Sequence, residues 1–291
     1  MNFSRFSLGL MRLNDWGFTT SQLIRFIEQN LELGITAMDH ADIYGSYTCE
    51  ENFGKAIAGK PLLRSRMQLV TKCGIKLVSE NRPAHTIHAY DTCMRHILQS
   101  AENSLKYLQT DYLDLLLIHR PDPLMNVDEI AEAFRQLKVE GKVLHVGVSN
   151  FSASQFDLLQ SRLDFPLVTN QVEVSVLKLD SIYDGVLDQC QQYRIKPMSW
   201  SPLAGGNLFH SSEARAIRLR KALDNICKAT GGYSMDQIAL AWLLKHPSGI
   251  IPVIGSGNID RIKKAVDSEK IILTGDQWFS ILEASTGVEV P

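Results

Sequence analysis

Short apolar runs of strand length alternate with longer amphipathic stretches along most of the chain. The apolar runs predict eight strands, at Ser7–Leu10, Ile35–Asp39, Met67–Lys72, Tyr112–His119, Val143–Ser149, Leu167–Gln171, Lys196–Trp200 and Ile251–Ile254. The stretches between and after them predict helices at Thr20–Leu33, Thr48–Ala58, Thr92–Leu108, Val127–Glu140, Ala153–Ser161, Ser181–Tyr193, Ala214–Thr230, Met235–Lys245, Asp260–Asp267 and Gly275–Ala284. This alternation is typical of parallel βα units.

Local signals at several helix ends support these assignments. Ser152 precedes one predicted helix, where its hydroxyl can accept from a free backbone amide. Asp128 and Glu129 place negative charge in the first turn of another helix. Gly34 follows the first helix and is well suited to a left-handed cap.

The number of βα units favours an α/β fold of the closed (β/α)8 TIM barrel class, formed as a single domain over residues 1–291. No Pro-, Gly- or Ser-rich linker separates the predicted elements. An open doubly wound sheet is the alternative, but no GxGxxG motif follows the early strands. The longest irregular stretches, Cys73–Asp91 and Arg120–Asn126, both follow strands, so in a barrel they lie at the rim of the active site.

The composition is that of an ordinary globular protein, with 45% hydrophobic residues, 21% charged residues and a formal net charge of -2. This balance indicates neither a nucleic-acid nor a membrane partner. The five cysteines form no CxxC pair and no Cys/His metal spacing, so we expect reduced thiols and no metal site. The N-terminus, MNFSRFSLGL, lacks the long apolar core and cleavage site of a signal peptide, and no apolar run approaches the roughly 18 residues of a membrane span. We therefore expect a cytoplasmic protein that is a monomer or a weak homo-oligomer.

Polar or aromatic side chains end seven consecutive predicted strands. They are Asp39, Lys72, His119, Ser149 with Asn150, Gln171, Trp200 with Ser201, and Ser256 after Gly255. Any one of these residues alone is more simply explained as a solvated turn residue or a hydrogen-bonded structural residue. Because the carboxyl ends of barrel strands converge on the mouth where barrel enzymes catalyse their reactions, the set together predicts an active site.

Five segments at these strand ends resemble the aldo-keto reductase family, in the same order along the chain. They are the segment Asp39–Gly45 (DHADIYG), Val70–Lys72 (VTK), Leu115–Pro121 (LLLIHRP), Gly147–Phe151 (GVSNF) and Asn170–Glu173 (NQVE). The likeness extends from about Leu8 to Ala265. Each motif is a weak pattern alone, but the ordered set is specific.

The resemblance implies that Tyr44 is a general acid, with Lys72, Asp39 and His119 as its catalytic partners. A carbonyl accepts hydride readily only if its oxygen receives a proton as negative charge builds. The ordinary pKa of tyrosine is about 10, and we expect the ammonium of Lys72 to lower it. Asp39 would keep the buried lysine protonated, and His119 would orient and polarise the carbonyl.

The resemblance also implies NADPH as cofactor. Ser149, Asn150 and Gln171 match family residues that bind the nicotinamide carboxamide, and Trp200 stands where the ring is stacked. Ser201, Leu203 and Gly205 match the pyrophosphate segment. The adenosine-phosphate segment contains Ser256, Gly257, Asn258 and Arg261, and the fork of Arg261 suits the 2′-phosphate. At the family's adenine-contacting asparagine position, this chain has Ala265.

These residues predict an NADPH-dependent reductase of aldehydes or ketones that acts on a small-molecule substrate. One alternative is a non-catalytic NADPH-binding redox sensor or regulatory subunit on the same barrel. Another is a phosphate-binding barrel enzyme in which Lys72 forms a Schiff base. The loops at Leu13–Phe18, Cys73–Asp91 and Arg120–Asn126 would determine specificity, but their residues do not identify the substrate.

Overall fold

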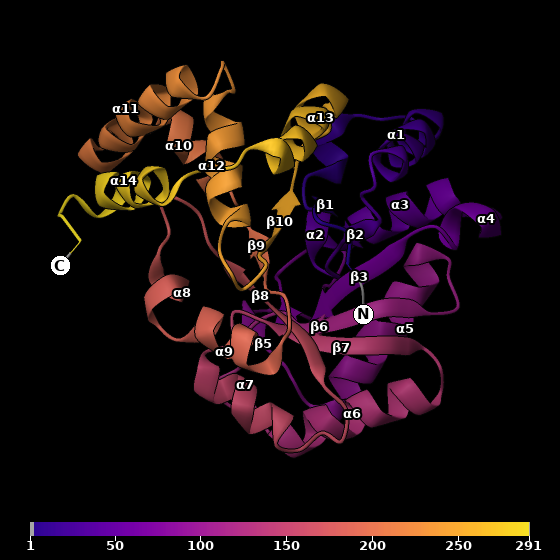
Figure 1. Cartoon of the computed structure of the whole chain (residues 1–291). Helices are drawn as coiled ribbons and strands as arrows, with labels where there is room; N and C mark the ends of the chain where they lie inside the picture. The colour runs from indigo at the N-terminus through magenta and orange to yellow at the C-terminus, as the bar shows by residue number, and fades with distance from the viewer. Residues whose placement is uncertain (1–2, 291) are drawn as a thin grey trace. The chain divides into compact units, whose positions relative to one another are not determined.

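The structure is a computed structural model that describes residues 3–290 (Figure 1). Eight parallel strands form a closed barrel in the order β1-β10-β9-β8-β7-β6-β3-β2. Their bounds are β1 Ser7–Gly9, β2 Ala37–Asp39, β3 Gln68–Cys73, β6 Leu113–Ile118, β7 Val143–Ser149, β8 Leu167–Glu173, β9 Met198–Trp200 and β10 Ile251–Ile254. The predicted (β/α)8 barrel is therefore confirmed, and every predicted strand coincides with or contains an observed one, except that β3 and β8 extend further.

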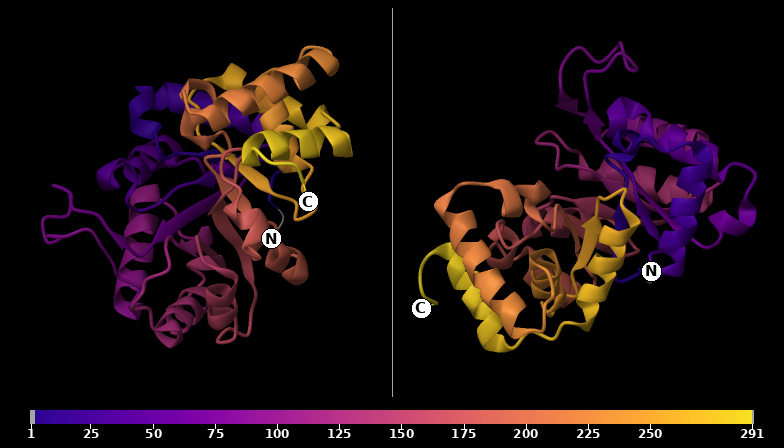
Figure 2. Two further views of the ribbon diagram at one scale, coloured as in Figure 1. Left: turned by 90° about the vertical axis from the view of Figure 1, so that its left-hand side faces the viewer. Right: turned by 90° about the horizontal axis from the view of Figure 1, so that it is seen from above.

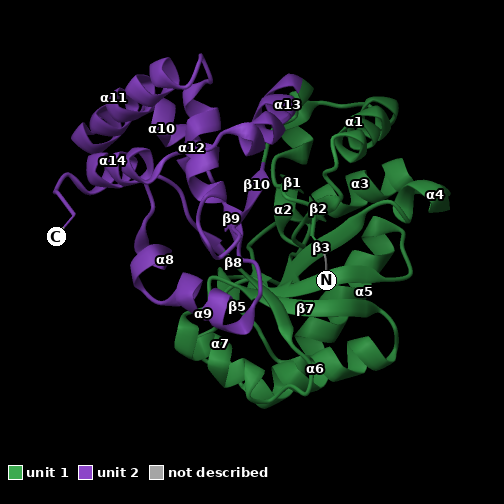
Figure 3. Ribbon diagram, viewed as in Figure 1, with its two compact units in different colours: residues 1–171, 255–259 green, residues 172–254, 260–291 purple. Residues whose placement is uncertain are grey.

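The contacts between Cα atoms divide the chain into two compact units (Figure 3). Unit 1 comprises Met1–Gln171 and Gly255–Ile259, and unit 2 comprises Val172–Ile254 and Asp260–Pro291. The assignment of residues 1–291 to one domain stays a prediction.

Unit 1 carries β1, β2, β3, β6, β7 and most of β8, surrounded by helices. The helices are η1 Leu13–Trp16, α1 Thr20–Glu32, α2 Tyr44–Tyr47, α3 Cys49–Ile57, α4 Pro61–Arg64, α5 Met94–Leu108, α6 Val127–Val139 and α7 Ala153–Gln160. Two of them begin with a capping box: Thr19 pairs with Gln22, and Ser152 pairs with Gln155. The cap expected at Ser152 is thus confirmed.

Parallel register aligns the strand ends within unit 1. Asp39 on β2 lies opposite Val70 on β3, and Lys72 on β3 lies opposite Leu117 on β6. Gln68 and Asp114, at the amino ends of β3 and β6, are only partly buried, whereas the residues that follow them are buried and include Lys72 near the carboxyl end of β3. The fold of unit 1 therefore gathers Asp39 and Lys72 although 33 positions separate them in sequence.

Unit 2 contains β9, β10, the end of β8 and the remaining helices. They are α8 Asp180–Tyr183, α9 Val186–Tyr193, η2 Ala204–Gly206, α10 Asn207–His210, α11 Ala214–Ala229, α12 Met235–Leu244, α13 Ile259–Asp267 (which begins in unit 1), η3 Ser268–Lys270 and α14 Gly275–Thr286. Trp242 and Trp278 stack at a centroid distance of 4.9 Å. Each indole N–H donates to the other residue's carbonyl at 3.1 Å, which joins α12 to α14.

The structure differs from the sequence prediction in two segments. The helix predicted at Ser181–Tyr193 is two helices, because Gly185 adopts a left-handed φ of 85° between them. The stretch Cys73–Asp91, predicted to be irregular, contains an antiparallel pair of short strands, β4 Ile75–Lys76 and β5 Ala89–Tyr90. The purple loop that joins them extends away from the neighbouring helices of unit 1 in both views of Figure 2. Within residues 3–290, no helix is long and apolar enough to cross a membrane.

Candidate active site

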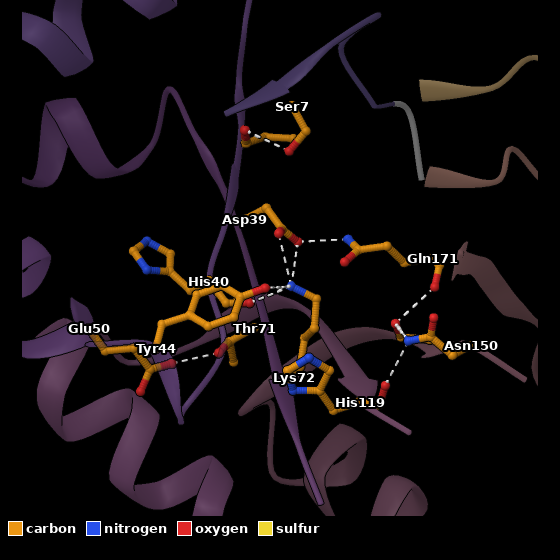
Figure 4. A network of polar contacts seen from close by, with 12 residues as sticks. Ser7, Asp39, His40, Tyr44, Glu50, Thr71, Lys72, His119, Asn150 and Gln171 are labelled. Carbon is orange, nitrogen blue, oxygen red and sulfur yellow. Dashed lines mark hydrogen bonds and ion pairs between the residues drawn. The ribbon is translucent and has the colours of Figure 1, made fainter. Parts of the chain in front are cut away.

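A buried polar network lies at the ends of β2 and β3 in unit 1 (Figure 4). At its centre is the amino group of Lys72, whose side chain is fully buried. Its Nζ lies 2.9 Å from each carboxylate oxygen of Asp39, 2.7 Å from the carbonyl oxygen of His40 and 3.1 Å from the hydroxyl of Tyr44. Three of the four residues predicted to be catalytic are therefore in direct contact.

The charge of Lys72 depends on these neighbours. Burial by itself lowers the pKa of a lysine, because it penalises the ammonium form. Asp39 and Tyr44 outweigh that effect, so the pKa of Lys72 is raised above its ordinary value. Lys72 is therefore an ammonium at neutral pH, as predicted from the sequence.

The pKa of Tyr44 was expected to be lowered by Lys72, but it is raised. Lys72 lowers it, as predicted, but burial raises it by more, and the nearby Asp39 also raises it. The net pKa of Tyr44 is therefore above 10.0, and the expectation of a net lowering is wrong for this structure. At neutral pH the phenol keeps its proton and can donate it.

The chain makes a tight turn directly after Tyr44. Gly45 has a left-handed φ of 56°, and a β-carbon there would lie 2.4 Å from Nδ2 of Asn14 and 2.6 Å from Sγ of Cys49. Only glycine fits this position without rearrangement. The glycine in the DHADIYG segment is thus explained by close packing and backbone conformation.

His119 follows β6 and lies beside Tyr44. The two rings meet edge to face at a centroid distance of 6.1 Å, and His119 is only 9% exposed. Burial lowers its pKa well below the ordinary value, and the positive charges of Lys72 and Arg120 add to this effect. The imidazole is therefore neutral at physiological pH and can donate one hydrogen bond to a carbonyl oxygen.

Three residues predicted to bind nicotinamide adjoin the same network. Gln171 donates from its amide to Asp39 at 2.8 Å. Asn150 donates to the carbonyl of His119 at 3.2 Å and to the hydroxyl of Ser149 at 2.8 Å. Ser149 in turn donates to the backbone carbonyl of Gln171 at 2.8 Å. Amide and hydroxyl groups therefore lie around the Asp39–Lys72–Tyr44 group, as expected.

Strand β7, which ends at Ser149 directly before Asn150, is irregular at Gly147. The register between β7 and β8 shifts between Val146 and Val148. A β-carbon at Gly147 would lie 2.8 Å from the carbonyl oxygen of Thr169 and from a methyl group of Leu117. Since Asn150 then adopts a left-handed φ of 61°, the strand ends in a turn that redirects the Asn150 side chain.

Gly257 and its neighbours form another part of unit 1. A β-carbon at Gly257 would lie 2.5 Å from the indole of Trp16, so this ring packs directly on the glycine. Trp16 also contacts Phe18 and Phe26, with centroid distances of 5.7 and 5.4 Å. The hydroxyl of Ser256 accepts from the amide of Asn258 at 3.2 Å. The predicted adenosine-phosphate segment is thus an ordered turn.

The remaining predicted cofactor residues belong to unit 2. Trp200 ends β9, and Ser201 and Gly205 have positive φ values of 49° and 62°. Within this turn, the amide of Ala204 donates to the carbonyl of Ser201 at 2.7 Å, and the amide of Gly206 donates to the carbonyl of Leu203 at 3.1 Å. Leu203 is partly buried in this turn, and Arg261 is exposed on α13. The roles of these residues in cofactor binding stay a prediction.

Sequence reasoning missed a second group of buried polar residues in unit 1. Glu50 is 3% exposed and accepts from Thr71 and Ser104, at 2.5 and 3.0 Å. Burial raises its pKa from 4.5 to about 7. His40 is fully buried, and burial lowers its pKa to about 3. Across residues 3–290, no group of three or more His, Cys, Asp or Glu side chains is arranged to hold a metal ion.

A parallel (β/α)8 barrel with an acid-base network at its strand ends has the construction of a barrel enzyme. Residues 5–285 match the Aldo/keto reductase family, and the chain belongs to that family. It is an enzyme of the oxidoreductase class. The resemblance seen in the sequence is confirmed.

Known relatives are similar to this chain over almost their whole length. The oxidoreductase YdhF of Escherichia coli is 50% identical over 289 residues, covering 99% of this chain and 96% of the relative. A 6-dehydroglucose reductase of Agrobacterium fabrum is 41% identical over 291 residues, covering 100% and 97%. The crystal structure of an aldo/keto reductase from Klebsiella pneumoniae in complex with NADP and acetate has a TM-score of 0.78 at 26% identity, covering 96% and 90%.

Proposed function

We propose that this enzyme reduces aldehyde or ketone carbonyls with NADPH, and that Tyr44 donates the proton to the carbonyl oxygen. The observation that carries this proposal is the contact of 3.1 Å between the Tyr44 hydroxyl and the buried ammonium of Lys72. A positioned phenol beside a fixed positive charge can protonate an oxygen as negative charge develops on it.

The raised pKa of Tyr44 is compatible with this role. An alkoxide is a much stronger base than a phenolate, so transfer from the phenol to the reduced carbonyl oxygen is favourable. The phenolate left behind is stabilised by Lys72, whose charge is maintained by Asp39. The neutral His119 orients the carbonyl by hydrogen bonding, while Tyr44 remains the proton donor.

NADPH is the cofactor that the chemistry of these residues supports. When bound, it supplies the hydride for the reduction. Ser149, Asn150 and Gln171 offer both donors and acceptors for a carboxamide, and Trp200 offers a ring for stacking. The turn with Ser201, Leu203 and Gly205 and the segment with Ser256, Gly257 and Asn258 would hold the phosphates and adenosine. Arg261 would bind the 2′-phosphate through its guanidinium.

The Schiff-base alternative is disfavoured by the state of Lys72. A lysine attacks a carbonyl only as a neutral amine. In this protein the raised pKa keeps Lys72 protonated, and its nitrogen already contacts Asp39, His40 and Tyr44. The alternative of a non-catalytic redox sensor is disfavoured because all four predicted catalytic side chains are present and grouped.

The substrate class is narrowed by the relatives. Because a protein 41% identical over the whole chain is a 6-dehydroglucose reductase, we propose 6-dehydroglucose as the first substrate to test. Its aldehyde on a hydroxylated carbon chain is a small carbonyl of the expected kind.

A substrate screen tests this proposal. NADPH oxidation is followed with 6-dehydroglucose, simple aldehydes, ketones and quinones, with NADH in parallel. We expect reduction of at least one aldehyde or ketone and a preference for NADPH. The absence of turnover with every carbonyl, despite tight NADPH binding, would favour the redox-sensor alternative.

Arg261→Ala tests the cofactor assignment separately. Loss of a charge-assisted contact to a phosphate should raise the Kd for NADPH about tenfold or more, and leave that for NADH nearly unchanged. Lys263→Ala is the matched control, because Lys263 is an exposed cation on the same helix, paired with Asp260. Equal weakening of both cofactors by Arg261→Ala would remove the 2′-phosphate role.

A further inference from the structure

The turn after Tyr44 contains a conformation that large L-residues seldom adopt. Gly45, Ser46 and Tyr47 are three consecutive residues with left-handed φ values of 56°, 55° and 71°. For a residue with a side chain this conformation is sterically unfavourable. Such strain persists only where surrounding contacts hold it in place. Contacts of the Tyr47 side chain are therefore needed to hold this backbone.

The side chain of Tyr47 is 6% exposed and is held at both its hydroxyl and its ring. The hydroxyl accepts from the amide of Leu77 at 2.7 Å and lies 3.3 Å from Nδ1 of His85. The guanidinium of Arg82 lies 4.4 Å from the ring centroid. All three partners belong to the loop that joins β4 to β5.

The same loop also binds the backbone of the turn. Asn81 donates from its side-chain amide to the carbonyl oxygen of Ser46 at 2.9 Å. Residues 77–85 of the loop thus contact two successive residues of the turn through a backbone amide, a carboxamide, an imidazole and a guanidinium. So many contacts account for the persistence of the left-handed backbone.

Backbone hydrogen bonds join this anchored segment to Tyr44. The amide of Tyr47 donates to the carbonyl of Ile43 at 3.3 Å, and the amide of Thr48 donates to the carbonyl of Tyr44 at 3.1 Å. The amide of Tyr44 donates to Ala41 at 3.1 Å. Residues 41–48 are therefore one hydrogen-bonded turn, so a displacement of Tyr47 would displace Tyr44.

We infer that Tyr47 is a positioning residue, which ties the loop of residues 77–85 to the turn and so fixes the Tyr44 hydroxyl beside Lys72. This inference rests on the proposed role of Tyr44 as proton donor. It assigns a function to Tyr47 and to its contacts with the loop, all of which lie outside the catalytic network.

Two substitutions distinguish the effect of the Tyr47 side-chain contacts from the effect of the strained backbone. Tyr47→Phe keeps the ring, its contact with Arg82 and the strained backbone, but removes the hydroxyl contacts to Leu77 and His85. Tyr47→Gly removes all contacts of the side chain and also relieves the backbone strain. Tyr107→Phe is the matched control, because the Tyr107 ring also faces Arg82, at 5.8 Å, while its hydroxyl has no hydrogen bond within the described part of the chain.

The first readout is the kinetics of carbonyl reduction. A misplaced catalytic group commonly costs between tenfold and a hundredfold in rate. We expect kcat to fall about tenfold in Tyr47→Phe and further in Tyr47→Gly, with the Kd for NADPH unchanged and with wild-type kinetics in Tyr107→Phe. Wild-type kcat in both Tyr47 variants would overturn the inference.

The second readout does not depend on activity. In protein labelled with ¹³Cζ-tyrosine, the Tyr44 resonance is identified by its loss in Tyr44→Phe and titrated with pH. Since Lys72 lowers the pKa of Tyr44, a hydroxyl displaced from Lys72 should titrate at higher pH in both Tyr47 variants. An unchanged resonance and titration would contradict the positioning role even if kcat fell. A wild type without reductase activity would instead remove the proposed function, while the titration would still decide whether Tyr47 positions Tyr44.

Discussion

Two buried carboxyl groups in unit 1, those of Asp39 and Glu50, have opposite kinds of partner. Asp39 lies 2.9 Å from the ammonium of Lys72, so the carboxylate is paired with an opposite charge. Glu50 is equally buried, but its direct partners are the hydroxyls of Thr71 and Ser104. Burial consequently raises the pKa of Glu50 to about 7. Burial also raises the pKa of the nearby Asp42 well above its ordinary value, and Glu50 adds to this effect.

The difference shows what a buried acid needs in order to remain charged. Hydroxyl donors lower the pKa of Glu50, but they do not offset its desolvation. An ammonium in direct contact provides the larger stabilisation that a buried carboxylate requires. Asp39 can therefore support a charged Lys72, whereas Glu50 is poised between its neutral and charged forms near neutral pH.

The largest loss of stability is expected from Lys72→Met. It leaves Asp39 buried without its cation, and breaking a buried pair from one side costs about 3–5 kcal/mol of unfolding free energy. Urea denaturation at about pH 7 measures this loss. The double variant Asp39→Asn, Lys72→Met should recover part of it, because no charge then remains unpaired. A loss below about 1 kcal/mol in the single variant would show that the pair is not buried as described.

Glu50→Gln should change the unfolding free energy in the opposite direction and stabilise the protein. Because the folded-state pKa of Glu50 is raised, its stability contribution is present below about pH 4.5 and is lost as pH rises toward about 7. The neutral amide escapes this loss, so the variant should gain up to about 3 kcal/mol relative to wild type at about pH 8, and little at about pH 4.

Glu51→Gln is the control for this prediction. Glu51 is the next residue of α3, 44% exposed and paired with Lys55. The exposed side chain should change stability by no more than about 0.5 kcal/mol at either pH. A gain in Glu50→Gln that did not depend on pH would exclude deprotonation of Glu50 as its cause.

A smaller effect concerns the pH dependence of reduction. Tyr44 must be protonated to act as an acid, and its pKa lies above 10.0. His119 stays neutral because its pKa is well below 6.5. We therefore expect kcat for reduction to vary by no more than about twofold between about pH 6 and about pH 9. A steep fall near pH 7 would assign the proton donor to another group.

The sequence predicted the barrel and the grouping of Asp39, Tyr44 and Lys72, because strand ends in a barrel converge and the motifs mark those ends. It did not predict the environment of Glu50, since Glu50 and Glu51 both read as acids in the first turn of a helix. A signal existed in helical phase: Glu50 shares a face with Phe53, Gly54 and Ile57, all of them buried.

The left-handed backbone of Tyr47 had no such signal. A tyrosine gives no indication of positive φ, which is the property of glycine and asparagine. Its conformation depends on contacts with Leu77 and His85, which lie 30 and 38 positions away in the sequence. Long-range anchoring of this kind is visible only once the fold is known.

Tyr44→Phe tests the central claim most directly, because it removes one hydroxyl and leaves the ring and the Asp39–Lys72 pair in place. NADPH consumption with an accepted carbonyl is compared between the variant and wild type, together with the Kd for NADPH. We predict a loss of kcat of at least about a hundredfold with an unchanged Kd. Wild-type turnover by the variant would contradict the assignment of Tyr44 as the proton donor.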